Sequence, residues 1–395
     1  MEENCRSGQS LNKLAEELGC TDRHLRRVFA RQYNVSPVKY LQTCRLLLAK
    51  NLLTDTNLTV LDVAMSSGFG SLRRFNDLFK KHYNLSPTAL RKKMPVDQKQ
   101  NSNITLTLSY RPPYLFDEML RFLCGHAISG VEVIKEGEYY RSVHLLDADV
   151  QNVYGWFKVG HNMKKNGLSV TISDTLLLVL PQVLSKIRHL FDLDCDPKTI
   201  YEKLSIMNTI RPGLCVLGSH VPGCFNAFEM AVRTILGQQI TVKAANTFAT
   251  RIVFAYGTPV QTGIPELTHV FPSPKDILVL DMPIENHFGP LGTSSSQAKV
   301  IYKLAQLLEE KEITLDYCAN PEAEIKKLMT ISGIGNWTAH YIAMRTIGWT
   351  DAFFESDVGI KKALAPYSTK DTLQLANKWQ PWRSYATINL WNATS

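Results

Sequence analysis

An internal repeat near the N-terminus constrains the fold more than any other feature of the sequence. The segment Tyr-Asn-Val-Ser-Pro at 33–37 recurs fifty positions later as Tyr-Asn-Leu-Ser-Pro at 83–87. Each copy is preceded by the same parts in the same order: a short apolar-periodic helix, a turn with a glycine (Gly19 or Gly68), and a basic helix. This order predicts two successive helix-turn-helix motifs within residues 10–93.

The positive charge of the chain is concentrated in this repeat. Residues 1–95 hold 16 Lys and Arg against 8 Asp and Glu, whereas the rest of the chain holds 28 of each. Five arginines near the starts of the two basic helices are the candidates for DNA contact: Arg23, Arg26, Arg27, Arg73 and Arg74. A recognition helix presents that end to base edges and phosphates. The alternative is a solvated basic helical pair of no particular function.

The middle of the chain has a different pattern. Residues 95–103 are polar and aperiodic, which predicts a flexible linker. Apolar and polar residues then alternate at 104–109, 139–145 and 168–173, while 114–128 has helical periodicity. These segments predict a small sheet backed by helices, followed by a mainly helical region.

Composition excludes several classes of protein. No apolar run reaches the length of a membrane-spanning helix, and the first residues lack the layout of a signal peptide. We therefore expect a cytoplasmic protein without a membrane partner. The 8 cysteines are scattered and form no C-x-x-C pair, so free thiols rather than a zinc site are expected.

The sharpest local signal is Ser-Gly-Ile-Gly-Asn-Trp at 332–337, where one helix is predicted to end and another to begin. Gly333 and Gly335 allow the backbone to turn sharply and to approach a phosphate, whose charge is favoured by N–H groups at a helix start. This is the pattern of a helix-hairpin-helix. A G-x-G turn alone is weak evidence, so the surrounding segments must decide the function.

Several ordered segments around this turn resemble the AlkA branch of the helix-hairpin-helix DNA glycosylases. They are Tyr-Arg-Pro-Pro-Tyr at 110–114, Val-Pro-Gly-Cys-Phe at 221–225, Ile-Leu-Gly-Gln-Gln at 235–239, Phe-Phe-Glu-Ser-Asp at 353–357 and Trp-Gln-Pro-Trp-Arg at 379–383. The repeat likewise resembles the tandem domain of AraC-type transcription regulators. The expected fold is multidomain and mainly α: an all-α tandem helix-turn-helix domain (1–94), a linker (95–103), a small α+β sheet domain (104–205) and an all-α helix-hairpin-helix glycosylase domain (206–395).

The resemblance implies that Asp357, after the hairpin, is the catalytic residue. Breaking the N-glycosidic bond leaves an oxocarbenium-like sugar, which a carboxylate stabilises while it orients or deprotonates the attacking water. From the residues alone, Asp357 could instead be a helix N-cap, and the two roles are compatible. Related bifunctional enzymes have a Schiff-base lysine at the position of Trp337, so no lyase activity is expected.

The resemblance also implies a base pocket and a wedge. The pocket rings would be Phe122, Trp337, Tyr341 and Trp391, which suit a cationic alkylated purine, although Trp337 and Tyr341 at this spacing equally suit core packing. The residue that fills the gap after base flipping would be Gln239 or Ile240, and the choice stays open. Gln238 and Thr338 are further expected DNA contacts.

No cofactor is required by this interpretation. The resemblance allows a monovalent cation at the hairpin, held by the backbone carbonyls of Met329, Ile331 and Ile334. The family's iron–sulfur subgroup has four clustered cysteines near the C-terminus, whereas here only Cys318 follows residue 224, so no cluster is expected. A cysteine-based zinc domain precedes the AraC-type part in Ada-type fusions, and only Cys5 lies ahead of the repeat here, so that sensor is not expected either.

These features predict a monofunctional DNA glycosylase that excises alkylated purines, of the 3-methyladenine and 7-methylguanine type, from double-stranded DNA in base excision repair. Its attached regulator domain would bind nearby or promoter DNA, and the protein is expected to be a monomer at the bacterial nucleoid. The alternative is a non-enzymatic AraC-type regulator that senses damaged DNA. Asp357 argues against that alternative, because a binding module has no need of a carboxylate facing an anionic ligand.

Overall fold

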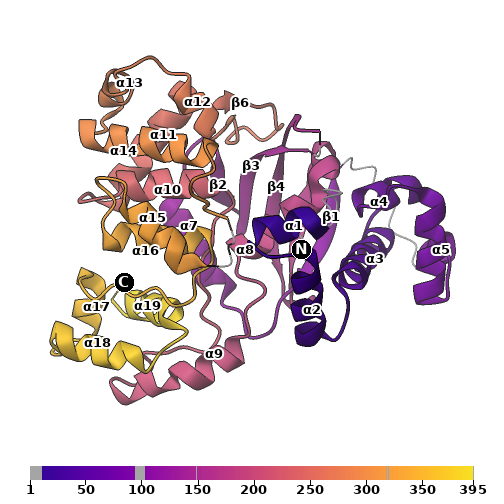
Figure 1. Ribbon diagram of the computed structural model, residues 1–395, viewed down its shortest axis with the longest axis horizontal. Helices are drawn as coiled ribbons and strands as arrows, with labels where there is room; N and C mark the ends of the chain where they lie inside the picture. Colours follow the sequence, from indigo (N-terminus) through magenta and orange to yellow (C-terminus); the bar gives the residue numbers. More distant parts are fainter. Residues whose placement is uncertain (1–10, 94–102, 148, 317, 319, 395) are drawn as a thin grey trace. The chain divides into compact units, whose positions relative to one another are not determined.

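A computed structural model describes residues 11–93, 103–147, 149–316, 318 and 320–394 (Figure 1). Cys5 and residues 95–102 of the predicted linker lie outside these ranges. Among the described helices, none combines the length and the apolar character that a membrane crossing requires.

The described chain divides into two compact units that do not follow chain order. The first contains the residues up to Leu108 together with Tyr140–Ile187, and the second contains Ser109–Tyr139 and the residues from Arg188 onward. All of the candidate glycosylase residues belong to the second unit, and the helix-turn-helix arginines belong to the first. The domain boundaries predicted at 94, 103 and 205 stay predictions.

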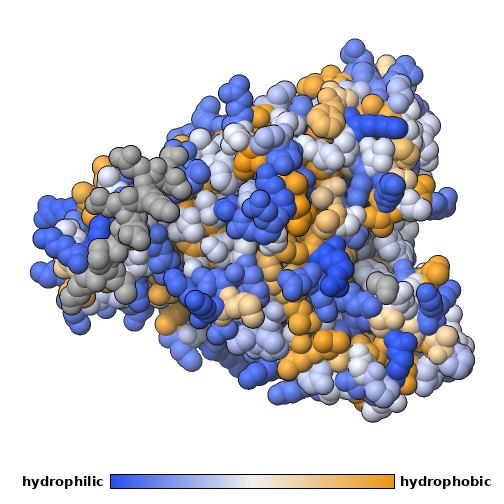
Figure 2. Space-filling model, turned by 180° about the vertical axis from the view of Figure 1, so that it is seen from behind, coloured by the Kyte–Doolittle hydropathy of each residue, from blue (hydrophilic) through white to orange (hydrophobic). Residues whose placement is uncertain are grey.

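Six helices form the N-terminal part and confirm the predicted tandem helix-turn-helix (Figure 1). They are α1 (Leu11–Glu17), α2 (Asp22–Tyr33), α3 (Pro37–Asp55), α4 (Val60–Ser66), α5 (Leu72–Tyr83) and α6 (Pro87–Lys93). In the view of Figure 2 the surface over α4 and α5, at the left of the picture, is largely hydrophilic.

The repeated five-residue segment stops one helix and starts the next. Asn34 and Asn84 both adopt a left-handed φ of 55° at the C-terminal ends of α2 and α5. Two residues later, the Ser36 side chain accepts from the backbone of Lys39, and a proline takes the first position of α3. Asparagine tolerates the left-handed conformation, and serine followed by proline is a strong N-terminal signal, so the repeat encodes two identical helix junctions.

The predicted small sheet is also confirmed, with strand order β1-β5-β4-β3-β2. Its strands are β1 (Ile104–Ser109), β2 (Glu132–Lys135), β3 (Glu138–Leu146), β4 (Asn152–Asn162) and β5 (Gly167–Ile172). β4 and β5 pair antiparallel with Phe157 opposite Ile172 and Gly160 opposite Ser169. Strands β2 and β4 were not among the predicted ones. β4 has glycine at 155 and 160, and these interrupt the apolar alternation by which a half-buried strand is recognised in sequence.

The remaining elements are mostly helical. The helices are α7 (Phe116–His126), α8 (Leu180–Leu190), α9 (Pro197–Leu204), α10 (Ala227–Leu236), α11 (Val242–Tyr256), α12 (Pro274–Leu278), α13 (Glu285–Phe288), α14 (Ser295–Glu309), α15 (Pro321–Met329), α16 (Asn336–Thr346), α17 (Val358–Ala363), α18 (Thr369–Asn377) and α19 (Arg383–Asn392). Short 3-10 helices cover Met163–Lys165, Asp174–Val179, Ser205–Thr209 and Gly289–Leu291, and β6 (Thr258–Pro259) pairs with β7 (His269–Val270).

Helix α16 lies between two hydrophobic cores of the second unit. Its residues Ala339, Ile342 and Ala343 belong to a core built mainly with α10, α11, α14 and α15. Met344 belongs to a second core built with α9, α17, α18 and α19, against which Trp337 and Tyr341 also pack. A helix buried on two sides has little rotational freedom, so the hairpin helix holds its aromatic side chains in fixed positions.

Candidate active site

The hairpin between α15 and α16 is closed by a glycine that no other residue could replace without strain. Gly333 has φ +100°, and a Cβ built on it would lie 2.6 Å from Cγ2 of Val300. Gly335 has extended backbone geometry, caps α16 without a side chain and has open space around it. The first amides of α16 are therefore accessible to a phosphate at a helix start.

Gln238 braces this turn from the end of α10. Its Nε2 donates to the carbonyl oxygen of Gly333 at 2.9 Å and to Oγ1 of Thr338 at 3.0 Å. The side chain of Thr338 is buried and already occupied by this bond. We therefore expect Gln238 and Thr338 to act on DNA through the turn, because their side chains hold its shape.

Three N–H groups hold the carboxylate of Asp357. Its Oδ1 accepts from the backbone of Ile360 at 3.0 Å and from the indole of Trp391 at 2.9 Å. Its Oδ2 accepts from the indole of Trp337 at 3.2 Å. Asp357 therefore caps α17, and the same geometry orients its half-buried carboxylate beside two aromatic rings. Gly359 leaves room for this arrangement, because a Cβ there would lie 3.0 Å from Cδ1 of Trp391.

Four rings from three segments form one cluster beside Asp357. The ring planes of Trp337 and Tyr341 stack at 5.0 Å with an interplanar angle of 10°. Trp391 lies 6.1 Å from Tyr341 and stacks on Phe354 at 5.8 Å. All of the predicted rings except Phe122 meet here, and Phe354 was missing from the predicted pocket. Trp337, Tyr341 and Trp391 are each partly exposed, so these rings pack on one another and also keep some solvent-exposed surface.

Phe122 joins the cluster through a buried arginine. The guanidinium carbon of Arg345 lies 4.8 Å from the Phe122 ring centre and 5.5 Å from that of Tyr341. Phe122 also stacks on His126 at 4.2 Å. A small cavity of about 30 Å³ beside Phe122 is lined on its other side by Ile388 and Asn392 of α19, the helix that carries Trp391. Arg345 was not predicted, because a single arginine on a helix of mixed polar and apolar residues gives no signal in sequence.

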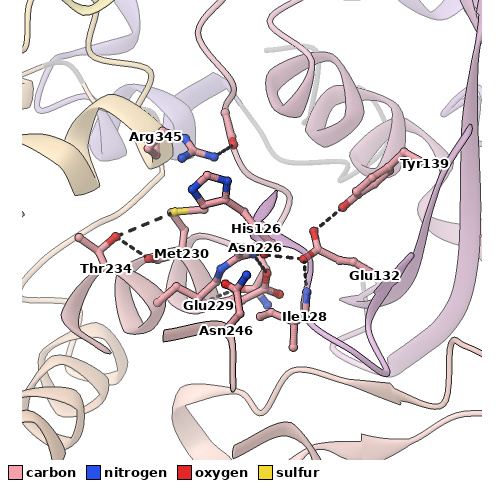
Figure 3. Close-up of polar contacts among 12 residues, drawn as sticks. His126, Ile128, Glu132, Tyr139, Asn226, Glu229, Met230, Thr234, Asn246 and Arg345 are labelled. Atoms are coloured by element: carbon pink, nitrogen blue, oxygen red, sulfur yellow. Dashed lines mark hydrogen bonds and ion pairs between the residues drawn. The ribbon is translucent and has the colours of Figure 1, made fainter. Parts of the chain in front are cut away.

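A buried ion-pair network lies next to this region (Figure 3). Arg233 contacts Glu132 and Glu229 at 3.2 Å each and also donates to the backbone carbonyl of His126. Glu132 accepts in addition from the Tyr139 hydroxyl at 2.6 Å. The network fixes the chain after α7 against α10, and so fixes the end of the helix that carries Phe122.

The two wedge candidates lie on the exposed loop between α10 and α11. Gln239 is exposed and has a left-handed φ of 61°, and Ile240 is 39% exposed. The loop leads into α11, whose first turns line a groove of about 390 Å³ with Lys243 and Arg251 among its residues. Basic groups beside this loop are suited to phosphate contact. The choice between Gln239 and Ile240 stays open.

The five predicted arginines of the helix-turn-helix part are all exposed. Arg23 is in the first turn of α2, and Arg73 and Arg74 are in the first turn of α5. Arg26 pairs with Asp22 of the same helix at 2.7 Å. These positions are compatible with groove contact, which stays a prediction.

The carbonyls predicted to hold a monovalent cation come from the end of α15 and the turn. Met329 is the last residue of α15, and the side chains of Ile331 and Ile334 are buried. The carbonyl of Ile331 accepts from the amide of Ile334 at 2.9 Å, so one of the three predicted ligands already has a backbone partner. The cation stays a prediction.

A cluster of three possible metal ligands was missed, because Asp192 and Cys195 are three positions apart but His220 follows 25 positions after Cys195. Ligand atoms of Asp192, Cys195 and His220 lie within 4.8 Å of one another. Burial raises the pKa of Asp192 to about 7, raises that of the Cys195 thiol well above its usual range, and lowers that of His220 to about 4. Asp192 accepts from the amide of Val221 and the hydroxyl of Tyr385 at 3.1 and 3.2 Å. These partners suit a buried polar cluster in which desolvation favours the neutral forms.

Three family descriptions match consecutive stretches of the chain. "Helix-turn-helix domain" matches residues 14–93, "AlkA N-terminal domain" matches 105–226, and "HhH-GPD superfamily base excision DNA repair protein" matches 232–378. The predicted order of a regulator-type domain, a sheet domain and a helix-hairpin-helix domain is thereby confirmed.

Relatives support the same order. The "Probable bifunctional transcriptional activator/DNA repair enzyme AlkA" of Mycobacterium tuberculosis is 32% identical, over 96% of this chain and 75% of that protein. The "DNA-3-methyladenine glycosylase 2" of Escherichia coli is 32% identical, over 72% of this chain and 96% of that protein. Among solved structures, a 3-methyladenine DNA-glycosylase from Archaeoglobus fulgidus shares the fold, with a TM-score of 0.58 at 18% identity over 72% of this chain and 96% of that one.

Proposed function

The chain belongs to the AlkA-type helix-hairpin-helix DNA glycosylases and has a helix-turn-helix domain on its N-terminal side, and on this premise we propose that it releases alkylated purines from duplex DNA by Asp357-assisted hydrolysis. Membership establishes a DNA-binding base excision repair glycosylase. The lesion class, the role of Asp357 and the absence of strand cleavage are the parts that we propose.

The placement of Asp357 is the observation that carries the proposal. Three N–H donors from α17, α16 and α19 fix its carboxylate, and two of those donors belong to rings of the aromatic cluster. A carboxylate held in one orientation costs little reorganisation when positive charge develops on the sugar. The same oxygen atoms can accept a proton from the water that attacks C1′.

The aromatic cluster supports alkylated purines as the substrate class. A purine methylated at N3 or N7 is cationic, and the faces of Trp337, Tyr341 and Trp391 attract a cation while they stack on the base. The base must leave the duplex to reach them, which assigns the exposed Gln239–Ile240 loop to the gap. The curated E. coli relative is named for 3-methyladenine, in agreement with this class.

The reaction would end at an abasic site. Trp337 presents an indole N–H to Asp357, and an indole cannot form a Schiff base with the sugar. Water is then the nucleophile, and the phosphodiester backbone stays intact. We further propose that the protein works as a monomer and that its helix-turn-helix domain adds affinity for nearby or promoter DNA.

The test is base release from methylated duplex DNA. Wild type should release 3-methyladenine and 7-methylguanine, and Asp357→Asn, which keeps an acceptor for the cap, should lose several orders of magnitude in rate. The DNA should be nicked only after alkali. Equal rates for the two proteins would remove Asp357 from the mechanism, and tight binding of damaged DNA without any release would favour the non-enzymatic regulator instead.

A further inference from the structure

Arg345 of α16 carries a buried charge among neutral partners. Figure 3 shows Arg345 near His126. Arg345 is 2% exposed, and its two terminal nitrogens donate to the Tyr341 hydroxyl at 2.6 Å and to the Gly223 carbonyl at 3.0 Å. Its Nε is buried without a partner in the described part of the chain. No carboxylate of the described residues lies within ion-pair distance of it.

An arrangement of this kind is unusual for a purely structural arginine. Buried charges are normally paired with an opposite charge, because desolvation is costly. Here the compensation comes from the ring faces of Phe122 and Tyr341. The nearby His126 ring adds no negative charge, and burial, with a smaller contribution from Arg345, lowers the pKa of that histidine to about 4. The positive charge at this place is therefore not neutralised locally.

The aromatic cluster connects this cation to the Asp357 carboxylate. Trp337 and Trp391 donate to Asp357, Tyr341 stacks on Trp337, and Arg345 donates to Tyr341. The contacts thus run from the anion through the rings to the cation. A base stacked on these rings would contact a cluster that has the carboxylate at one end of its contacts and the guanidinium at the other.

We propose that Arg345 is an electrostatic positioning residue that acts with Asp357 to drive positive charge from the base to the sugar. This inference rests on the proposed function. In the reaction, the C1′–N bond breaks and its electron pair stays with the purine. A cationic N-alkylpurine then leaves as a neutral base, and the sugar becomes positive until water adds at C1′ and gives up a proton. A fixed positive charge near the base and a fixed negative charge near the sugar both favour this transfer of positive charge from the base to the sugar.

The proposal predicts opposite effects on binding and on rate. A fixed cation beside the base repels a cationic purine in the bound ground state, and this repulsion disappears as the base becomes neutral. Interactions that improve only towards the transition state raise the rate of the chemical step. For a neutral purine such as hypoxanthine, the base becomes negative as it leaves, so Arg345 speeds release without weakening binding. A merely structural arginine would not distinguish the two bases.

The experiment compares Arg345→Met, which removes the charge, with Arg345→Lys, which keeps it. Single-turnover release of 7-methylguanine should fall about tenfold in Arg345→Met, the size expected for one charge acting across a pocket at intermediate dielectric. Arg345→Lys should recover most of that loss. Binding is measured in the Asp357→Asn background, so that neither duplex is cleaved. For each protein in that background, the affinity for the 7-methylguanine duplex is divided by the affinity for the hypoxanthine duplex. This ratio should be higher for Arg345→Met than for the protein that keeps Arg345.

The outcomes separate the two hypotheses. Arg345→Met and Arg345→Lys could slow base release equally and weaken the binding of both duplexes by the same factor. That result would identify Arg345 as a structural brace. It would overturn the inference while the glycosylase function stands. No release by wild type would instead overturn the proposed function. Thermal unfolding checks that the variants fold, and Arg345→Gln replaces Arg345→Met in the same comparison if the latter does not.

Discussion

The indole nitrogen of Trp391 lies 2.9 Å from Oδ1 of Asp357, so a ring of the proposed base pocket is also a hydrogen-bond donor to the carboxylate. The two residues are 34 positions apart in the chain. The proposed function therefore couples base recognition and orientation of the carboxylate in one side chain, and we expect that mutation can separate the two roles.

Trp391→Phe should slow base release more than it weakens binding of damaged DNA. The substitution keeps a ring that can stack on Phe354 but removes a donor to a charged acceptor. A bond of that kind contributes about 1.5–3 kcal/mol, which corresponds to roughly a ten- to hundredfold loss in rate. Single-turnover release and duplex affinity are the measurements, with Trp382→Phe as a matched control. Parallel losses in both quantities would show that the indole N–H has no separate role.

Gly333→Ala should destabilise the hairpin, whereas Gly335→Ala should leave its stability almost unchanged. Position 333 has φ +100° and no room for a Cβ, and a strained backbone of this kind costs about 1–3 kcal/mol. Position 335 has extended geometry and open space. Urea unfolding measures both variants. If Gly335→Ala nevertheless weakens DNA binding, the added methyl group blocks the approach of a phosphate. Equal destabilisation of the two variants would show that the left-handed backbone at Gly333 is not the source of the lost stability.

Arg233→Met should lower the free energy of unfolding by about 3–5 kcal/mol, since it leaves Glu132 and Glu229 buried without their shared cation. The partly exposed Arg188, which pairs with the exposed carboxylate of Asp194, provides a control, and Arg188→Met should cost less than about 1 kcal/mol. Chemical denaturation of the two variants tests the difference. A loss of similar size in both would mean that the buried network is not the source of the stability.

Protonation of two desolvated histidines should reduce stability as the pH drops from 6.5 towards 4, and the raised pKa of Asp192 should offset part of this loss. Burial lowers the pKa of His126 and of His220 from 6.5 to about 4, so both stay neutral in the fold while the unfolded chain takes up protons. Each histidine should therefore make the free energy of unfolding about 2 kcal/mol smaller at pH 5 than at pH 7. His220→Gln should remove one such contribution. An unchanged pH profile in His220→Gln would contradict the assignment.

Substitution of Arg73 and Arg74 by alanine should reduce the salt dependence of duplex binding. Each phosphate contact that is lost lowers the slope of log affinity against log salt by about 0.9. The exposed Lys378 of the glycosylase part provides a control, and Lys378→Ala should leave the slope unchanged. If the double variant keeps the wild-type slope, then α5 does not contact phosphates.

Local signals allowed much of the fold to be predicted. The helix-turn-helix pair, strands β1, β3 and β5, and the hairpin were all visible in sequence. Strand β4 was not, because glycines at 155 and 160 interrupt the apolar alternation in its sequence. The placement of Asp357 at a helix start was also predictable, and the structure gives it the capping bond to Ile360 in addition to the two indole donors.

What the sequence by itself determined were the features that depend on neighbouring residues: the asparagine stop and serine start of the repeated helices, the glycine turn of the hairpin, and the cap at Asp357. Turns and caps are local, since their hydrogen bonds span only a few positions. Only the tertiary structure decided that Trp391 donates to Asp357, that Phe354 joins the rings and that Arg345 lies buried beside Phe122 without a counter-ion among the described residues. Burial and charge compensation depend on segments that are distant in the chain, and no local pattern records them.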